Sequence, residues 1–413
     1  MTDIATTCCI AGGGPAGMML GYLLARAGVD VTVLEKHADF LRDFRGDTVH
    51  PSTLRVMDEL GLLDDFLKCP HQEVDQLAGK VGDDLIHVAD FRRLPVRAKF
   101  IALMPQWDFL NFLADKAKAF PSFHLVMRAE ATWLRREGDK VVGLEAMTPD
   151  GPLTIASDLV VGADGRTSTV REAAGLKVED LGAPMDVLWM RLPRDPKDDD
   201  GAPLGRIKAG GIFVMIPRGD YFQCGFVVKK GGAEEEMAKG LPAFRAAIED
   251  FAPFMKGRTE ALKSWDDVKL LTVTVDRLTQ WALPGLLCIG DAAHAMSPVG
   301  GVGINLAIQD AVATANLLWR PLKERRLTLA DLQSVQARRM FPTKTTQAGQ
   351  VFIQRRAIAP TLAGAQIRAP AIAKLVDRHP LLQGLAARAV GLGVQPEHVE
   401  SPNAPRSTPV GAA

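Results

Sequence analysis

The feature that most constrains this chain is a glycine-rich segment near its start, AGGGPAG at residues 11–17. The segment follows an apolar, strand-like run and opens an amphipathic helical pattern that stops at Gly28. A second apolar run then ends at Glu35. This order predicts a strand, a tight glycine turn, a helix and a second strand, which together make one βαβ unit. Such a unit is typical of α/β proteins with a parallel sheet.

The glycines of this turn have the spacing that binds the pyrophosphate of a dinucleotide. Gly12 permits the tight turn, Gly14 lets the backbone approach the pyrophosphate, and Gly17 lets the helix pack closely on the strand. Glu35, about 18 residues further on, stands where a carboxylate accepts hydrogen bonds from ribose hydroxyls. We expect an ADP-containing dinucleotide here, and a plain βαβ turn is the alternative. The residues expected at its ADP part are Gly12, Gly14, Pro15, Ala16, Gly17, Glu35 and Lys36.

A second motif, GDAAHAMSPVGGVGIN at residues 290–305, lies between a buried strand-like run and a long helical pattern. Asp291 stands at the end of the strand, which is where open α/β sheets bind ligands. The glycines at 300–303 leave main-chain N–H groups bare at the start of the helix. Such an end favours negative charge by about 0.3 to 1 kcal/mol when exposed. A reduced flavin is anionic at its N1/C2=O edge and a nicotinamide ring is not, so we expect FAD.

Composition and charge argue against several other classes of function. Lys plus Arg and Asp plus Glu are each 49, so the formal net charge is zero and we expect no nucleic-acid partner. The five cysteines form no C-x-x-C pair and are odd in number, which fits a reducing cytoplasm, and we expect no metal site. The start of the chain lacks the pattern of a signal peptide, and no run approaches the roughly 18 apolar residues of a spanning helix. We expect a cytoplasmic protein without integral membrane contact.

The strand pattern divides the rest of the chain into two territories. From residue 123 to 163, short alternating runs separated by Gly-Asp and Asp-Gly turns predict a β-meander and then a buried strand that ends at Asp164. From 183 to 275, strand-like runs with one helix between them predict a second, mainly antiparallel sheet. After 303 the pattern is helical, and from 396 the composition is that of a disordered tail.

Three segments together resemble a known family: AGGGPAG with LEK, GADGRTSTVR at 162–171, and GDAAHAMSPVGGVGINLAIQDA at 290–311. In order and spacing they are similar to the single-component, FAD-dependent aromatic hydroxylases, the family of para-hydroxybenzoate hydroxylase, over residues 5–320. The resemblance implies an α/β fold in which a discontinuous Rossmann-like FAD-binding domain with a β-meander is interrupted by a mainly antiparallel substrate-binding sheet and followed by C-terminal helices. The expected boundaries are 1–72, 97–180 and 267–330 for the FAD-binding domain, 73–96 and 181–266 for the substrate-binding sheet, 331–395 for the helices and 396–413 for a disordered tail.

The resemblance also assigns residues to the flavin. It implies that Asp164 and Gly165 lie near the pyrophosphate and help with NAD(P)H, and that Asp291 holds the ribityl chain or a phosphate. It further implies that Pro298 and the segment 300–305 line the isoalloxazine. The residues of this second motif expected at the cofactor are Gly290, Asp291, Pro298, Gly301, Gly303, Ile304 and Asn305.

Two more residues are assigned in the same way. Arg45 in DFRGD occupies the place of the family's flavin-contacting arginine, and Gln106 in PQWDFL resembles a polar residue that touches the FAD. The arginine that usually follows this glutamine is Trp107 here, which weakens the second assignment.

The chemistry implied by the resemblance is oxygen transfer to an aromatic ring. NADPH or NADH reduces the FAD, which reacts with dioxygen to a flavin C4a-hydroperoxide, and this hydroxylates a phenolic, quinoid or polyketide-like small molecule. One alternative is a flavin-dependent reductase, dehydrogenase or halogenase-like enzyme on the same fold. The other is a non-catalytic, FAD-binding module that responds to redox state.

The residues that we expect at catalytic positions are Arg45, His50, Tyr221 and Pro298. Tyr221 lies at the turn end of a predicted hairpin, and either supplies a pocket hydroxyl or packs at the rim of the sheet. His50 either faces the flavin or substrate or caps the helix that follows it. His294 either closes the turn after Asp291 or takes part in catalysis.

The sequence says less about the substrate and the oligomeric state. The strands of the second sheet suggest only that the substrate pocket is apolar, and their facing is left open. The apolar residues concerned are Met190, Phe213, Met215, Phe222 and Phe226. The segment 359–394 is apolar with spaced basic residues, so it packs on the FAD-binding domain, contacts a dimer partner or makes a peripheral membrane contact. We therefore expect a monomer or a homodimer.

Overall fold

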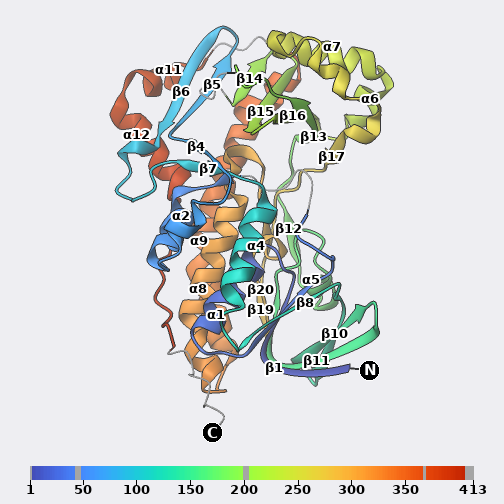
Figure 1. Cartoon of the computed structure of the whole chain (residues 1–413), viewed down its shortest axis with the longest axis vertical. Helices are drawn as coiled ribbons and strands as arrows, with labels where there is room; N and C mark the ends of the chain where they lie inside the picture. Colours follow the sequence, from blue (N-terminus) through green and yellow to red (C-terminus); the bar gives the residue numbers. More distant parts are fainter. Residues whose placement is uncertain (1, 42–47, 199–203, 366–368, 405–413) are drawn as a thin grey trace.

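The computed structural model describes residues 2–41, 48–198, 204–365 and 369–404 of the chain (Figure 1). A sheet with packed helices lies at one end of the molecule, a second sheet lies at the other, and the long helices α8 (Gly303–Lys323) and α9 (Leu329–Ile353) pack against each other beside them (Figure 1). In the described ranges, no helix has the length and apolar character needed to cross a membrane.

The first sheet has the strand order β19-β20-β11-β1-β2-β8. Its central strands β1 (Thr2–Ala11) and β11 (Gly151–Gly162) are parallel, and β2 (Val31–Glu35) and β20 (Leu286–Cys288) extend the parallel sheet on either side. These strands are continuous apolar runs because a parallel sheet is buried on both faces. The predicted α/β fold class and the βαβ unit at the start of the chain are therefore confirmed.

The β-meander differs from the expectation at its first strand. β8 (Phe123–Met127) pairs in parallel with β2, so residues 123–127 belong to the first sheet and not to the meander. The meander itself consists of β9 (Glu130–Glu137) and β10 (Lys140–Thr148), which lead antiparallel into β11. Alternation along a strand indicates which face is buried but not which strand is its neighbour, and this explains the error.

Helices cover the first sheet and form its core. α1 (Pro15–Arg26) contacts α8 and α4 (Gln106–Ala117). Ten consecutive residues of α1, from Ala16 to Ala25, are buried, so this helix is enclosed on all sides. The core around these helices includes the ends of β1, β2, β11 and β20, which places the carboxyl ends of these strands beside the N-termini of α1 and α8.

The second sheet has the order β17-β13-β16-β15-β14-β5-β6. Its centre is antiparallel and consists of β13 (Met185–Pro193), β16 (Tyr221–Lys229) and β15 (Gly211–Arg218). β5 (Gln76–Val81) joins it through a parallel pairing with β14 (Gly205–Lys208). The mainly antiparallel sheet predicted between 183 and 275 is thus present, and the hairpin of residues 76–90, which lies within the expected segment 73–96, joins it. The expected domain boundaries stay a prediction.

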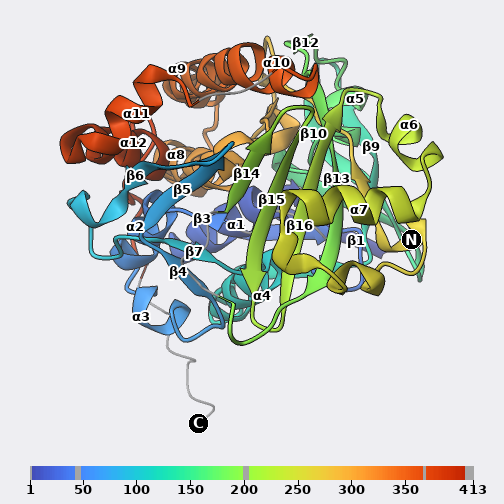
Figure 2. The same cartoon turned by 90° about the horizontal axis from the view of Figure 1, so that it is seen from above.

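Helices α6 (Ala233–Ala238) and α7 (Leu241–Phe251) cover one face of this second sheet, and Figure 2 shows α7 lying across β13, β15 and β16. The other strands and helices are short. They are β3 (Thr48–Val49), β4 (Gln72–Val74), β6 (Asp84–Asp90), β7 (Ile101–Leu103), β12 (Val178–Asp180), β17 (Lys269–Leu271), β18 (Asp276–Leu278), β19 (Ala282–Leu283), β21 (His294–Ala295), α2 (Pro51–Glu59), α3 (Leu63–Phe66), α5 (Thr169–Ala173), α10 (Ala359–Leu362), α11 (Ala371–Arg378) and α12 (Pro380–Gly391).

The tail expected to be disordered from residue 396 is packed as far as residue 404. Glu397 is buried and bonds Arg338 and Arg339 on α9, and the Ala404 N–H donates to the carbonyl of Arg26 at the end of α1. The expectation is wrong for these residues because a proline-rich, polar composition does not exclude specific hydrogen bonds to two helices. Residues 405–413 lie outside the described part.

Candidate active site

The glycine turn has the geometry that its sequence predicts. Gly12 has φ 106°, and a Cβ on it would lie 2.4 Å from the carbonyl oxygen of Ala163. A Cβ on Gly17 would lie 1.9 Å from the carbonyl oxygen of Gly12, so the helix packs directly on the turn. Gly14 is the N-cap residue of α1 and has no atom within 4 Å of its Cβ position. The open side of the turn is therefore at Gly14, where the N–H groups of the first turn of α1 are free of intrahelical partners.

Glu35 ends β2 beside this turn and is buried. Its carboxylate accepts from the N–H of Gly13 at 3.2 Å and from the N–H of His37 at 3.0 Å. Glu35 therefore holds the glycine loop in place. Lys36 is exposed and pairs with Glu130 at 3.8 Å.

Two more loops leave the same edge of the sheet. β11 ends before Asp164 and Gly165, and β20 ends before Gly290 and Asp291. Because both strands are parallel to β1, their carboxyl ends meet at the glycine turn. Gly290 has φ 58°, and a Cβ there would lie 3.1 Å from the Cβ of Ala16 on α1. The three motifs found in the sequence are thus brought together.

The polar groups of these loops are partly paired with one another. Arg166 Nε donates to Asp291 Oδ2 at 3.1 Å, and Asp164 Oδ2 accepts from the N–H of Val170 at 3.0 Å. Asp164 Oδ1 and Arg166 Nη1 are buried and have no partner within the described ranges. Burial raises the pKa of Asp164. Buried polar atoms are almost always satisfied, so a donor and an acceptor beside Asp291 fit the polyol and phosphates of a bound dinucleotide.

The loop between β21 and α8 is held by an asparagine. Gly300 and Gly301 have φ 79° and 63°, and a Cβ on Gly301 would lie 2.6 Å from Thr48 Oγ1. Asn305 Oδ1 accepts from the N–H of His50 at 2.8 Å and from Thr53 Oγ1 at 2.7 Å. Its amide nitrogen lies 3.2 Å from the carbonyl of Thr48 and donates to it. Asn305 therefore fixes this loop against the start of α2, with its side-chain groups directed to protein atoms.

Pro298, Gly303 and Ile304 flank these glycines and are half-buried at the entrance of α8. Gln106 is half-buried in the first turn of α4. Arg45 lies outside the described residues, so its assignment stays a prediction.

A buried ion network supports the loop at Gly290, and the sequence analysis did not identify it. Asp310 on α8 is fully buried and accepts from the N–H of Gly290 at 3.1 Å, from Arg339 Nε at 2.9 Å and from His294 Nε2. Burial alone would raise the pKa of Asp310, but His294 and Arg339 together hold it below its usual range. His294 is thus tied to α8 through Asp310, and its part in the turn after Asp291 or in catalysis stays a prediction. The overlooked signal was an aspartate inside an apolar helical pattern, because a buried carboxylate requires a partner.

His50 is fully buried at the N-cap position of α2 but makes no side-chain cap bond. Its Nδ1 lies 3.0 Å from the carbonyl oxygen of Val390, and burial lowers its pKa to about 4. The imidazole is therefore neutral near pH 7, with Nδ1–H donating to Val390. Tyr221 is half-buried at the start of β16, with the guanidinium of Arg191 over its ring at 5.1 Å. Catalytic roles for His50 and Tyr221 stay predictions.

The apolar strand residues named for the pocket lie on the face of the second sheet that α7 covers. They pack with Phe244 and Ile248 of α7 in one buried cluster, whose described members include no strand of the first sheet. The sequence left their facing open because alternation shows two faces without showing which of them a helix covers. The residues concerned are Met190, Phe213, Met215, Phe222 and Phe226.

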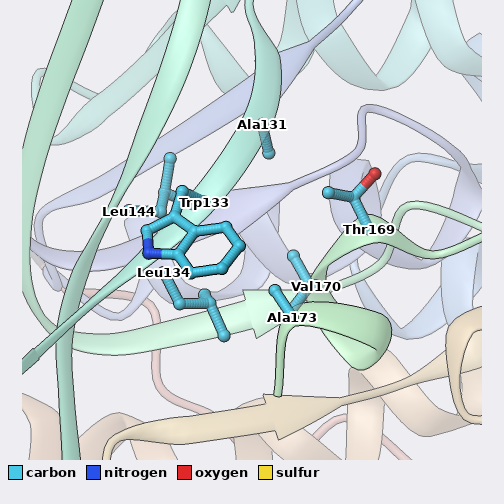
Figure 3. Close-up of a pocket in the computed structure, with 7 residues that line it drawn as sticks. All are labelled: Ala131, Trp133, Leu134, Leu144, Thr169, Val170 and Ala173. Atoms are coloured by element: carbon cyan, nitrogen blue, oxygen red, sulfur yellow. The ribbon is translucent and has the colours of Figure 1, made fainter. Parts of the chain in front are cut away.

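Two hollows lie elsewhere. A shallow apolar hollow of about 160 Å³ lies between the meander and α5, and Figure 3 shows Trp133, Leu134, Val170 and Ala173 around it. This hollow is lined by no titratable side chain and is not at the carboxyl ends of the parallel strands, so it is not part of the candidate active site. A larger hollow, of about 400 Å³ on the same measure, lies behind Asn305, next to Gln309 and Arg339.

A family model described as an FAD binding domain matches residues 5–348. The chain belongs to this family. A 6-methylpretetramide 4-monooxygenase of Streptomyces rimosus is 34% identical to it over 409 residues, which is 96% of this chain and 94% of the relative. The chain spans 60 to 65% of the length of three other curated relatives, among them a rifampicin monooxygenase of Streptomyces venezuelae.

Solved structures agree with the fold. The p-nitrophenol 4-monooxygenase of Pseudomonas putida has a TM-score of 0.72 at 19% identity and covers 94% of both chains. An anhydrotetracycline hydroxylase of Streptomyces rimosus has a TM-score of 0.70 at 23% identity and covers 94% of this chain and 76% of that one. The family resemblance stated from the motifs is confirmed.

The chain is an FAD-dependent monooxygenase, as predicted, and FAD, a reduced nicotinamide donor and dioxygen are its cofactor and cosubstrates. The relatives do not support the reductase, halogenase-like or non-catalytic alternatives.

Proposed function

We propose that this monooxygenase hydroxylates a planar, multi-ring aromatic molecule of the phenolic, quinoid or polyketide type. The observation that carries the proposal is the meeting of three strand ends at one edge of the first sheet. There Asp164 and Arg166 each have a buried atom without a partner among the described residues, and Arg166 bonds Asp291. The substrate class is supported by the relative named 6-methylpretetramide 4-monooxygenase and by the fold shared with an anhydrotetracycline hydroxylase. When bound, FAD would carry electrons from the nicotinamide to dioxygen and would transfer one oxygen atom to the aromatic ring.

The residues of the chain have three tasks in this proposal. The glycine turn with Pro15, Ala16 and Glu35 binds the ADP part, and the open N-terminus of α1 favours its negative charge. The loops after β11 and β20 bind the pyrophosphate and ribityl chain. The segment from Pro298 to Asn305 binds the isoalloxazine, with Asn305 as a positioning residue because its side chain holds the loop. Arg45, Gln106 and Lys36 keep their assignments as predictions.

Oxygen consumption tests the function. The wild-type enzyme should oxidise NADPH or NADH faster when the aromatic substrate is added, consume dioxygen, and form a product heavier by one oxygen atom. Substrate-stimulated NAD(P)H oxidation in the absence of dioxygen, with no oxygenated product, would contradict the proposal.

The role of Asp291 is tested separately. Asp291→Ala should purify with less bound FAD, because the variant loses the carboxylate that faces the polyol and leaves Arg166 without its partner at 3.1 Å. Asp3→Ala is the matched control, since Asp3 is an exposed aspartate at the opposite end of β1. Equal flavin content in Asp291→Ala and in the control would refute the assignment.

We propose a homodimer that forms through the apolar face of α11, α12 and β6. Leu381, Leu385 and Ile372 are 79%, 63% and 65% exposed, and Leu85 and Leu375 lie on the same three contacting elements. Their exposed surface is on the order of 500 Å², against roughly 800 Å² per partner in a standard interface. Light scattering should give twice the monomer mass for the wild type and the monomer mass for Leu381→Glu. A monomeric wild type that sediments with lipid vesicles would show a peripheral membrane contact instead.

The location of the enzyme is proposed as cytoplasmic. All five cysteines are free and four of them are buried, which suits a reducing compartment. Fractionation of the native host should recover the activity with the cytoplasmic markers, and recovery in the medium or periplasm would contradict this.

A further inference from the structure

Trp189 in the middle of β13 has a polar atom that no described residue satisfies. Its indole Nε1 is buried, yet no described acceptor lies within hydrogen-bond distance. An indole N–H is a donor only, so it requires an oxygen or another acceptor. Buried donors in native proteins are nearly always paired, and an exception calls for an explanation. One explanation is a bound ligand that supplies the acceptor.

The position of Trp189 on its strand points to the substrate. Neighbouring residues of a strand face opposite sides, and Met190 belongs to the cluster under α7. Trp189 is therefore on the other face of the sheet. There it packs against the cluster of Val187 and Val227, and Val299 of the flavin-loop segment packs against the same cluster. Trp189 thus lies on the face of the second sheet that meets the loop after Pro298.

The strand opposite makes room for the indole ring. Trp189 pairs with Gly225 of β16, and a Cβ on Gly225 would lie 3.2 Å from Cζ3 and 3.3 Å from Cη2 of the indole. The backbone of Gly225 is extended, so no turn requires a glycine here. The close approach of the indole explains why position 225 is a glycine. Gln223, two residues earlier on the same strand and so on the same face, is also buried. The six-membered ring of the indole therefore lies over Gly225, on the face of the sheet that also carries Gln223.

We propose that the indole N–H of Trp189 donates a hydrogen bond to a carbonyl, quinone or phenolate oxygen of the aromatic substrate. The bond fixes the orientation of a planar molecule over the loop after Pro298 and so selects the ring carbon that is hydroxylated. Trp189 is in this sense a specificity-determining residue. The inference rests on the proposed function and adds to it the requirement for an acceptor oxygen on the substrate.

Trp189→Phe tests the inference, because phenylalanine keeps an aromatic ring and removes the donor. Binding is followed in the oxidised, FAD-loaded enzyme by the change in flavin absorption on titration with 1,8-dihydroxyanthraquinone, a planar molecule with quinone and phenol oxygens. The variant should bind this probe about 5- to 10-fold more weakly than the wild type, the loss expected for one hydrogen bond. In turnover, its KM should rise more than its kcat falls, and its product should be a mixture of positional isomers.

A structural role would give a different pattern. If the N–H has no protein partner, its removal costs the free enzyme no hydrogen bond. The Tm of Trp189→Phe should then fall no further than that of Trp265→Phe, which loses the same ring atoms. Trp265→Phe is the matched control, because Trp265 lies in the same part of the chain but packs against the cluster on the α7 face. The control should leave the affinity for the probe unchanged.

Three results would overturn the inference. They are probe binding by Trp189→Phe within twofold of the wild type, a Tm that falls further than in Trp265→Phe, and a wild-type holoenzyme that does not bind the probe. Failure of the proposed function is distinguishable, because it appears as a wild type that oxidises NAD(P)H without forming any oxygenated product.

Discussion

Replacing Asp310 by asparagine is the sharpest test of how this fold supports its cofactor loop. Asp310 accepts from Arg339 at 2.9 Å, from His294 and from the N–H of Gly290, and both Asp310 and Arg339 are at most 1% exposed. Two opposite charges at that separation attract by about 6 kcal/mol at an effective dielectric constant of about 20. Desolvation of both ions offsets much of this attraction, so the pair as a whole adds little.

Removing one partner is costly nonetheless. In Asp310→Asn the guanidinium of Arg339 stays buried and keeps only the more distant Glu397, at 3.4 Å, as a counter-charge. We expect the free energy of unfolding to fall by roughly 3 to 5 kcal/mol, the usual cost of leaving a buried charge unpaired. The N–H of Gly290 also loses a charged acceptor, so FAD should dissociate more readily. Thermal unfolding with simultaneous detection of flavin fluorescence measures both effects.

A second substitution separates charge from packing. Asp310→Asn combined with Arg339→Met removes the unpaired cation, so the double variant should be more stable than Asp310→Asn alone. Glu324→Gln is the surface control, since Glu324 is exposed and should change stability by less than about 1 kcal/mol. If Asp310→Asn loses less than about 1 kcal/mol, or if the double variant is the less stable of the two, the account of the network is refuted.

Three further outcomes follow from the same geometry. Gly301→Ala should lower the affinity for FAD, because Gly301 has φ 63° and the new methyl group would lie 2.6 Å from Thr48 Oγ1. Gly349→Ala inside α9 meets open space and should stabilise the protein by about 0.5 to 1 kcal/mol. Flavin retention measures the first effect and Tm the second. Asn305→Ala should cost about 2 to 4 kcal/mol through the lost hydrogen bonds and reduce flavin retention, and an unchanged flavin content would contradict its positioning role. The pKa of Asp310 is lower in the folded than in the unfolded protein, so its stabilising contribution is complete above the unfolded-state pKa near 4 and is lost as the pH falls through the folded-state pKa. The Tm of the wild type should therefore fall more steeply below about pH 4 than the Tm of Asp310→Asn. Parallel pH profiles of the two Tm values would contradict this.

Much of the fold could be predicted from the sequence, because the residues that a local turn requires are the same residues that define the ligand-binding motif. The turn at residues 11–17 needs glycine at positions where a Cβ would meet backbone atoms, and the same positions define the dinucleotide motif. The motifs at Asp164 and Asp291 both follow buried apolar strands, and strand ends in a parallel sheet meet at one edge. Local spacing therefore predicted a long-range arrangement.

The errors lie where the neighbour of a segment decides its role. The facing of Phe213 and Phe226 could not be read from the sequence, and both pack under α7, because a strand with two apolar faces does not show which face a helix covers. The tail after 396 has the composition of a disordered segment and is fixed by Glu397 on two arginines of α9. In both cases a contact between distant segments overrides a local pattern.

The same reasoning explains why Asp310 and Trp189 escaped notice while Asp291 did not. Asp291 stands in a motif whose spacing carries its meaning, whereas the importance of Asp310 follows only once Arg339, 29 residues further along the chain, is seen beside it. Trp189 in an apolar strand is ordinary in sequence, and it becomes informative when its N–H is found buried without an acceptor opposite Gly225. A motif identifies groups that touch a common cofactor. Groups that position a loop or select one particular substrate are identified by the contacts they make, or fail to make, in three dimensions.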